Sequence, residues 1–282
     1  MIEIEGFKES LDAFEKALFK ELPPLARIDF WTKEAITHKG DTTFEIRHSD
    51  EASTKSSPVL PDMSICNECL AELKDPHNRR YHYFFTNCTN CGPRYSIIKT
   101  VPYDRPYTSM QPFVMCDKCK DEYTNPLDRR YHAQPISCSK CGPTLVLRSM
   151  KGDLLSKNEE AIIKLAELIN TGHIVAMKGM GGFHLMCDAT NEIVVGRLRE
   201  RKHRPTKPFA VMFKDIEDLN KYAFLGDYEK KVLTSKESPI VLLKKKQDTN
   251  LSNLIAPNIK NIGCFLPNSA LHYLLFENLS NP

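Results

Sequence analysis

Eight of the ten cysteines in this 282-residue chain occur as four C-x-x-C pairs. The pairs are Cys66/Cys69, Cys88/Cys91, Cys116/Cys119 and Cys138/Cys141, so that the pattern C-x2-C-x18-C-x2-C occurs twice. Two such pairs supply four thiolates at the corners of a tetrahedron around Zn²⁺, with Zn–S distances of about 2.3 Å. The spacing therefore predicts two structural zinc sites whose coordination is complete, with no position open for catalysis.

The spacing leaves the metal and the ligand sets open. Four thiolates also suit an iron–sulfur cluster, although two pairs joined by a long arm are more typical of zinc ribbons. The ligand sets are either those within each repeat, as a duplication would produce, or cross-braced sets that mix the pairs. Free buried thiols are a third interpretation, which the regular C-x-x-C spacing disfavours.

The residues around the cysteines are repeated as well. Residues 75–93 and 125–143 share nine of nineteen positions at an offset of fifty, and the run Arg79, Arg80, Tyr81 and His82 recurs as Arg129, Arg130, Tyr131 and His132. Because zinc with four thiolates carries a formal charge of −2, we expect these arginines to balance that charge and the tyrosines to pack nearby. A ligand-binding surface is the alternative. Gly92 and Gly142, directly after the second pairs, suit a tight turn facing the sulfurs.

A second candidate site is basic. Residues 197–208 read RLRERKHRPTKP, and residues 178–184 read KGMGGFH. The candidate nucleotide-binding residues are Lys178, His184, Arg199, Lys202, Arg204 and Lys207. So many like charges in one turn repel each other unless an anion lies among them, and glycines let a backbone approach phosphate closely. A solvated helix end is the plainer alternative. Cys187 and Cys264, outside the pairs, are expected to be buried as small apolar residues.

Composition sets broad limits on the function. The net charge of +3, the hydrophobic fraction of 41% and the charged fraction of 27% are those of an ordinary soluble protein, and they do not demand a polyanionic partner. The first twenty residues are too rich in acids and lysines for a signal peptide, and no apolar run approaches the ~20 residues that span a bilayer. We expect a cytoplasmic protein without a membrane partner.

Three regions must hold these residues. Residues 1–52 predict a helix over Ser10–Leu22 between strands at Ile2–Glu5, Ala26–Trp31 and Thr43–Arg47, followed by the polar linker SDEASTKSSP from Ser49 to Pro58. Residues 59–150 hold the cysteine pairs and show almost no apolar periodicity, so this region needs metal in order to fold.

Residues 151–282 alternate between helical and strand patterns. We expect a capping box of Ser156 with Glu159, a helix that buries Ile162, Leu165, Ala166 and Ile169 and ends at Gly172, and a helix capped by Thr190 that runs to about Arg201. Strands are expected at Ile174–Met177, Phe209–Phe213 and Ile240–Leu243, with two short helices within 215–236. This is an α/β pattern with a mixed sheet.

These motifs together resemble one family. The doubled cysteine pattern with its DRRYH-like and CGP segments resembles the zinc region of the hydrogenase-maturation carbamoyltransferases, the HypF family. KGMGGFHLMCDAT, the pattern at 199–212 and GCFLPNSALHYLLF at 263–276 resemble its YrdC-like domain, and ELPPLARIDFW with FEIRHSD resembles the tail of its acylphosphatase-like domain. The resemblance implies an α+β and α/β multidomain fold: a partial ferredoxin-like piece over 1–52, two zinc-ribbon-like C4 modules over 59–150, and a YrdC-like domain with a mixed twisted sheet over 151–282.

The chain also departs from the family pattern. The acylphosphatase signature, the Ser-Gly-Asn nucleotide motif and the C-terminal carbamoyl-transfer domain are not found, and Asn268, Ser269, Ala270 and Tyr273 replace family residues. We therefore expect a fragment that binds nucleotide weakly and lacks complete activity.

The resemblance implies an ATP-dependent carbamoyltransferase, a ligase-like chemistry in three steps. First, carbamate is released from carbamoyl phosphate. Second, the carbamate is joined to AMP from ATP, with Mg²⁺. Third, the carbamoyl group passes to the C-terminal cysteine of a HypE partner, on the way to the cyanide ligands of [NiFe] hydrogenase. Lys202 and Arg204 match the family's Lys-x-Arg phosphate-binding pair, Arg199 and Lys207 support them, and Lys178 and His184 line the same pocket. No catalytic residue is assigned. The alternative is a zinc-stapled RNA-binding or interaction module, with double-stranded RNA held by the YrdC-like domain.

Overall fold

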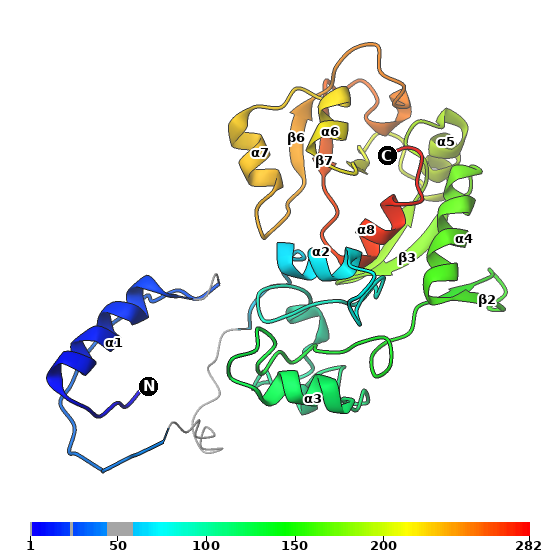
Figure 1. Cartoon of the computed structure of the whole chain (residues 1–282). Coiled ribbons are helices and arrows are strands. Elements are labelled where there is room, and N and C mark those ends of the chain that lie inside the picture. The colour runs from blue at the N-terminus through cyan, green and yellow to red at the C-terminus, as the bar shows by residue number, and fades with distance from the viewer. Residues whose placement is uncertain (1, 23–24, 44–58) are drawn as a thin grey trace. The chain divides into compact units, whose positions relative to one another are not determined.

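The computed structural model describes residues 2–22, 25–43 and 59–282 and divides the chain into two compact units, Met1–Ser56 and Ser57–Pro282 (Figure 1). The two units are described separately. The predicted linker Ser49–Pro58 lies outside the described residues, as does nearly all of the predicted strand Thr43–Arg47. No helix in the described ranges is long and apolar enough to cross a membrane.

The described part of the first unit holds one helix, α1 (Lys8–Lys20), close to the predicted one. The strands predicted at Ile2–Glu5 and Ala26–Trp31 are wrong, because neither segment forms a β-ladder. Side-chain hydrogen bonds, rather than a β-ladder, connect Glu5 to a distant part of this unit. The Glu5 carboxylate accepts hydrogen bonds from the backbone N–H groups of Gly40, at 2.9 Å, and Asp41, at 3.2 Å. α1 itself buries no residue.

The two cysteine repeats, residues 66–93 and 116–143, have the same local structure. Helices α2 (Asn67–Lys74) and α3 (Asp117–Thr124) begin directly after a cysteine in each repeat. The next turns are closed by equivalent side chains, since Asn78 and Asp128 accept the backbone N–H groups of Arg80 and Arg130 at 2.9 and 2.7 Å. The duplication in the sequence is therefore a duplication in the fold. The 3₁₀ turns η1 (Tyr95–Ile97) and η2 (Arg105–Tyr107) lie between the repeats.

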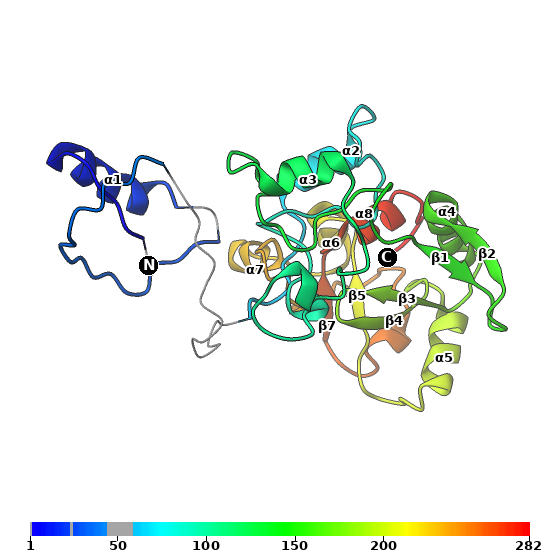
Figure 2. The ribbon, with the colours of Figure 1, turned by 90° about the horizontal axis from the view of Figure 1, so that it is seen from below.

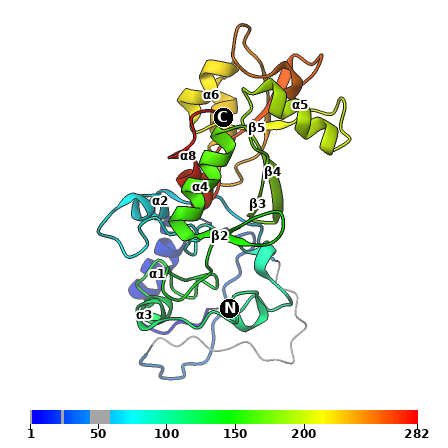
Figure 3. The same ribbon diagram turned by 90° about the vertical axis from the view of Figure 1, so that its right-hand side faces the viewer.

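After the second repeat the chain forms two antiparallel pairs of strands. β1 (Val146–Arg148) pairs with β2 (Leu154–Lys157), and α4 (Asn158–Asn170) follows. β3 (Val175–Gly179) pairs with β4 (Gly182–Met186) in a hairpin, visible edge-on in Figure 3, and α5 (Glu192–Arg201) comes next. The predicted apolar face of α4 is confirmed, because Ile162, Leu165, Ala166 and Ile169 are all buried.

The mixed sheet predicted for this region is confirmed. Its strand order is β5-β7-β6, in which β5 (Ala210–Met212) runs parallel to β7 (Asn261–Phe265) and β6 (Val241–Lys244) runs antiparallel to it. The remaining elements are α6 (Ile216–Tyr222), α7 (Asp227–Leu233), η3 (Asn253–Ile255) and α8 (Ala270–Phe276). β4, β7 and α8 were not predicted as separate elements.

Two predicted helix caps are wrong. Ser156 lies in β2, its hydroxyl has no hydrogen-bond partner among the described residues, and Lys157 is the N-cap residue of α4. α5 is capped by Asn191, whose side-chain oxygen accepts the Val194 N–H at 3.2 Å. Thr190 instead donates its hydroxyl to the Asp188 carboxylate at 2.7 Å. In both helices the N-cap residue is the next residue along the chain, Lys157 or Asn191, which has the extended backbone that the position requires.

The first repeat shares a core with the C-terminal elements. Leu73 of α2 is fully buried in one cluster with Leu165 of α4, Met177 of β3 and Leu271 of α8. α2, α8 and α4 accordingly follow one another across Figure 1. The second repeat has a separate small core of Cys119, Ala133, Ile136 and Cys138. The described residues from 59 onward therefore form one unit, anchored through the first repeat.

Candidate metal centres and basic loop

The four sulfur atoms of each repeat lie together. Within each set all ligand atoms are within 4.8 Å of one another. In the first repeat Sγ–Sγ distances are 3.6 Å for Cys66–Cys88 and 3.8 Å for Cys88–Cys91, and in the second 3.8 Å for Cys116–Cys138 and 3.6 Å for Cys119–Cys141. A tetrahedron with Zn–S distances of about 2.3 Å has edges of about 3.8 Å. The sets are those within each repeat, they fit zinc, and no cross-braced set occurs among the described residues.

The glycines after the second pairs are required by close packing. Gly92 has φ of +88°, and a Cβ atom there would lie 2.6 Å from the Cβ of Asn87. At Gly142 a Cβ would lie 2.2 Å from the Tyr83 hydroxyl and 2.4 Å from the Ser137 Cβ. Any larger residue would push the cysteine turn away from these neighbours, a packing reason that adds to the tight turn expected from the sequence.

The recurring arginines cross from one repeat to the other. Arg79 donates to the Sγ of Cys119 at 3.2 Å and forms an ion pair with Glu122 at 2.6 Å. Arg80, 2% exposed, donates to the Ser137 carbonyl at 3.0 Å and also pairs with Glu122. Burial alone would raise the pKa of the Glu122 carboxyl, but hydrogen bonds and charge from the two arginines lower it to about 2.

The reverse contacts repeat this pattern. Arg129 donates to the Sγ of Cys69 at 3.1 Å and pairs with Glu72 at 2.6 Å. Arg130, also buried, pairs with Glu72 and donates to the Asn87 carbonyl at 3.0 Å. Each cluster therefore receives its two guanidinium groups from the other repeat, a relation that spacing could not show.

The recurring histidines differ in their surroundings. His82 lies between two carboxylates, with Nδ1 2.6 Å from Glu159 of α4 and Nε2 3.6 Å from Glu277. His132 stacks on Tyr123, with ring centroids 4.9 Å apart. The first histidine therefore joins its repeat to the C-terminal elements, and the second stays within its own repeat.

Two of the predicted nucleotide-binding residues contact backbone. Arg199 of α5 is 6% exposed, and its guanidinium donates to the carbonyls of Arg204, at 2.7 Å, and Ile255, at 3.1 Å. Arg204 donates to the carbonyl of Pro208 at 2.7 Å. Both guanidinium groups lie over the Phe209 ring, at 4.7 and 5.2 Å from its centroid. These two arginines shape the loop between α5 and β5.

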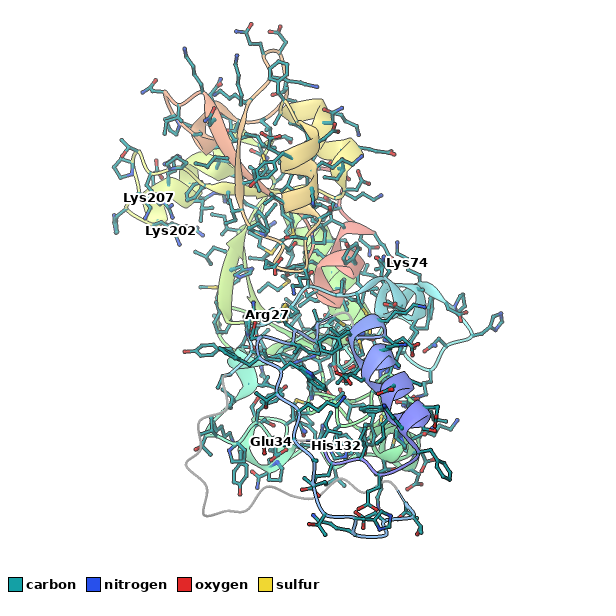
Figure 4. The ribbon with its side chains drawn as sticks, turned by 90° about the vertical axis from the view of Figure 1, so that its left-hand side faces the viewer. Arg27, Glu34, Lys74, His132, Lys202 and Lys207 are labelled. Atoms are coloured by element: carbon teal, nitrogen blue, oxygen red, sulfur yellow. The ribbon has the colours of Figure 1, made fainter. Side chains whose placement is uncertain are left out.

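Lys202 and Lys207 are exposed on the same loop and are labelled in Figure 4. Both are solvent-facing charges of the basic segment 197–208, and Arg199 supports their loop through its hydrogen bond to the Arg204 carbonyl. A loop of this kind can receive phosphate oxygens without reorganising its backbone.

The β3–β4 register separates Lys178 from His184. Lys178 is paired with Phe183, and Met177 is paired with His184, so that the two candidates lie on opposite faces of the hairpin seen in Figure 2. Lys178 lies over the exposed Phe183 ring, with its Nζ 5.7 Å from the ring centroid. His184 is on the Met177 side. The structure does not bring the two side chains together.

His272 is a candidate that sequence reasoning missed. It lies in α8, is 1% exposed, and neither ring nitrogen has a hydrogen-bond partner among the described residues. Its ring stacks on that of His184, with centroids 5.9 Å apart. Burial, helped by His184, lowers the pKa of His272 to about 4, so it is neutral at pH 7. The helical spacing of leucines around it in SALHYLLF was the available signal.

Of the two cysteines outside the pairs, Cys264 is buried as expected, whereas Cys187 is only half-buried. Burial raises the pKa of Cys264, in β7, to about 12 and that of Cys187 to about 11. Thiols held protonated in this way are poor nucleophiles.

Comparison with known proteins adds two family matches. The finger family described as "HypF finger" matches residues 65–98 and 115–148, which contain both cysteine sets. The Sua5/YciO/YrdC family, described as "Telomere recombination", matches residues 167–282.

Whole-chain relatives carry one name. "Carbamoyltransferase HypF" of Synechocystis sp. is 46% identical over 99% of this chain and 36% of that protein. "Probable carbamoyltransferase HypF" of Methanocaldococcus jannaschii is 47% identical over 97% of this chain and 36% of its own length. The chain thus spans about a third of the relatives it matches.

Two solved structures are similar throughout. One, described as full-length HypF in the phosphate- and nucleotide-bound form, has a TM-score of 0.88 and 42% identity over 98% of this chain and 36% of that one. HypF of T. kodakarensis has a TM-score of 0.85 and 45% identity over 97% of this chain and 34% of that one.

Proposed function

We propose, since this chain belongs to the HypF carbamoyltransferase family, that it supplies the zinc-finger region and the carbamoyl-adenylate domain of an ATP-dependent carbamoyltransferase. The observation that carries the proposal is the basic loop of α5 and β5, a preformed set of cations on a YrdC-type sheet. We assign residues 1–52 to an acylphosphatase-like piece, 59–150 to the fingers and 151–282 to the adenylate domain.

The proposed reaction joins carbamate, obtained from carbamoyl phosphate, to the α-phosphate of ATP and releases pyrophosphate. Charge builds on the phosphate oxygens as the bond to the leaving pyrophosphate breaks, so fixed cations stabilise the transition state. The carbamoyl group would then pass to a cysteine of a HypE-type partner. Mg²⁺ bound with ATP would share the neutralisation of the phosphates.

Within the loop the four basic residues have different roles. Lys202 and Lys207 are exposed and would bind phosphate oxygens directly. Arg204 would add a guanidinium whose orientation is fixed by the Pro208 carbonyl and the Phe209 ring. Arg199, which is buried, is a positioning residue that ties the loop to η3.

The solved relative named for its phosphate- and nucleotide-bound form supports nucleotide as the ligand class, because it is similar along nearly the whole of this chain. The two faces of the β3–β4 hairpin are assigned different roles. His184 and the buried His272 form the inner side, close to the core, while Lys178 belongs to the outer side. We place the small carbamate group, if the chain binds it, on the histidine side.

The eight paired cysteines are proposed to hold two zinc ions. Each set is closed, so the metal would stabilise the fold of residues 59–150 and supply no open coordination position. Within this chain, the catalytic charge is therefore assigned to the basic loop and not to the zinc sites.

Nucleotide binding by the 282-residue chain tests the proposal. Calorimetry with a non-hydrolysable ATP analogue and Mg²⁺ should detect weak binding, which Lys202→Ala with Lys207→Ala reduces by about tenfold or more. Lys164→Ala, at an exposed position on α4, is the matched control and should leave affinity unchanged.

Double-stranded RNA is measured in parallel across a salt series. Tight RNA binding with a steep salt dependence, together with no nucleotide binding, would reject the adenylate site and favour the RNA-binding alternative. Equal nucleotide affinity of the double lysine variant and the wild type would reject the loop as its site.

A further inference from the structure

The arginine exchange between the repeats links the two metal centres. Arg79 and Arg80 belong to the first repeat but contact Cys119 and Glu122 of the second. Arg129 and Arg130 of the second repeat contact Cys69 and Glu72 of the first in the same way. We call these four residues the cross-repeat arginines.

Each buried arginine holds both halves of the other cluster. Arg80 contacts the first cysteine pair of the second cluster through the Sγ of Cys119, in α3, at 3.8 Å. It reaches the second pair through the Ser137 carbonyl, one residue before Cys138. Arg130 does the same for the first cluster. It is 3.8 Å from Cys69 Sγ and 3.0 Å from the carbonyl of Asn87, one residue before Cys88.

The position of each arginine depends on its own cluster. Arg79 and Arg80 lie in the segment between the first repeat's two cysteine pairs, and a metal shared by Cys66/Cys69 and Cys88/Cys91 would tie the two ends of that segment together. Loss of the first metal would free this segment and withdraw both guanidinium groups from the second cluster. The same holds in reverse for Arg129 and Arg130.

Other contacts cross the same boundary. The Thr89 hydroxyl donates to the Arg129 carbonyl at 2.8 Å, and the Asn87 side-chain amide donates to the Pro135 carbonyl at 3.2 Å. The Tyr83 hydroxyl lies 3.2 Å from that of Ser137. Three of these six residues, Asn87, Thr89 and Ser137, directly adjoin one of the paired cysteines, so these contacts join the surroundings of one cluster to those of the other.

We propose that the two zinc sites bind and release metal as one coupled unit, with the four cross-repeat arginines as the physical link. The proposal rests on the fit of the two cysteine sets to zinc and is independent of the nucleotide site. It predicts that the one-zinc state is less populated than it would be if the two sites bound metal independently.

Partial zinc withdrawal tests the coupling without any substitution. The zinc-loaded chain is treated with a chelator until half of the metal is removed, and native mass spectrometry measures the zero-, one- and two-zinc species. Two independent and equal sites would put half of the molecules in the one-zinc state. Coupling predicts a clearly smaller one-zinc fraction, and a fraction of half or more overturns the proposal.

A variant identifies the link. Arg79→Gln with Arg80→Gln leaves all eight cysteines in place, and loss of partners around metal ligands commonly lowers metal affinity by about 10- to 100-fold. We expect faster zinc release and a one-zinc fraction that rises toward half. Arg148→Gln is the control, since within the described part of the chain the Arg148 guanidinium donates only to the nearby Gly152 carbonyl, at 2.8 Å.

A second variant keeps the proposal testable if the double arginine variant does not fold. Cys138→Ser disables the second cluster, so coupling predicts that the remaining zinc is released from the first cluster at least about tenfold faster than from the wild type. Release at the wild-type rate would mean that the repeats hold metal independently and would overturn the proposal.

Discussion

The imidazole rings of His184 and His272 stack with their centroids 5.9 Å apart, one from β4 and the other from α8. His272 is almost wholly buried, and within residues 2–22, 25–43 and 59–282 neither of its ring nitrogens has a hydrogen-bond partner; burial lowers its pKa and keeps it neutral at pH 7. An imidazole in this state makes the stability of the chain sensitive to acid.

The pH dependence has a definite sign. Burial, with a smaller effect of His184, lowers the pKa of His272 from 6.5 to about 4, so the unfolded chain takes up this proton first as the pH falls. The part of the unfolding free energy that comes from this difference in pKa is fully present above pH 6.5. It is lost as the pH falls from 6.5 to 4, by roughly 3 kcal/mol in total. Urea unfolding of His272→Leu at several pH values should show a shallower decline than the wild type.

The exposed His203 provides the control, because His203→Asn should decline as steeply as the wild type. Zinc loss at acid pH affects all three proteins and cancels in the difference. Parallel curves for His272→Leu and the wild type would show that His272 does not titrate in this window.

Leu73 should stabilise the C-terminal elements as well as its own repeat, because it lies in the core of α4 and α8. Leu73→Ala removes a fully buried side chain, and such changes cost about 2–5 kcal/mol. Leu127→Ala, at a 94% exposed position of the second repeat, should have almost no effect. Thermal unfolding followed by circular dichroism compares the two, and similar melting temperatures would contradict a shared core.

Arg199→Lys should weaken nucleotide binding through the shape of the loop. A lysine keeps the positive charge but cannot donate to the carbonyls of both Arg204 and Ile255. We expect about a tenfold loss of affinity for the ATP analogue, together with increased proteolysis at residues 202–208. Arg201→Lys, exposed at the end of α5, should change neither measurement. Reduced affinity without any change in proteolysis would instead indicate direct contact of Arg199 with phosphate.

Gly92→Ala should disturb the first cluster more than its backbone angle alone implies. Gly92 and Gly152 have similar angles, φ of +88° and +92°, but a Cβ at Gly152 would meet nothing within 4 Å. Gly152→Ala therefore isolates the backbone effect, about 1 kcal/mol. Gly92→Ala adds the contact with Asn87 and should also lower zinc retention, measured by atomic absorption after dialysis. Equal zinc content of the two variants would contradict this.

The sequence predicted best where chemistry or periodicity is local. Cysteine spacing predicted two four-sulfur sites, although it left open which pairs share a site, and apolar periodicity predicted the buried face of α4. The strands at Ile2–Glu5 and Ala26–Trp31 were wrong, because strand-like composition forms no ladder unless a partner segment lies beside it.

The candidate sites show the same limit. The arginine exchange joins Arg79 to Cys119, and no local pattern contains that pairing. The opposite faces of Lys178 and His184 follow from the hairpin register, which the expected Gly-rich turn left undefined. Arg199 looked like an anion ligand by composition, and only the carbonyls around it show that it is used internally.

The duplicated repeats also record how two copies of one segment diverge. Where both copies face each other, at the arginines and at Glu72 and Glu122, they have kept the same residues, because a change in either copy removes a contact from its twin. Where their surroundings differ, the copies have separated: Leu73 enters a core beside α8, whereas the equivalent Tyr123 donates to Gln134 within its own repeat. Each copy therefore depends on its twin for two of the arginines around its own cysteines, and neither repeat is structurally complete without the other.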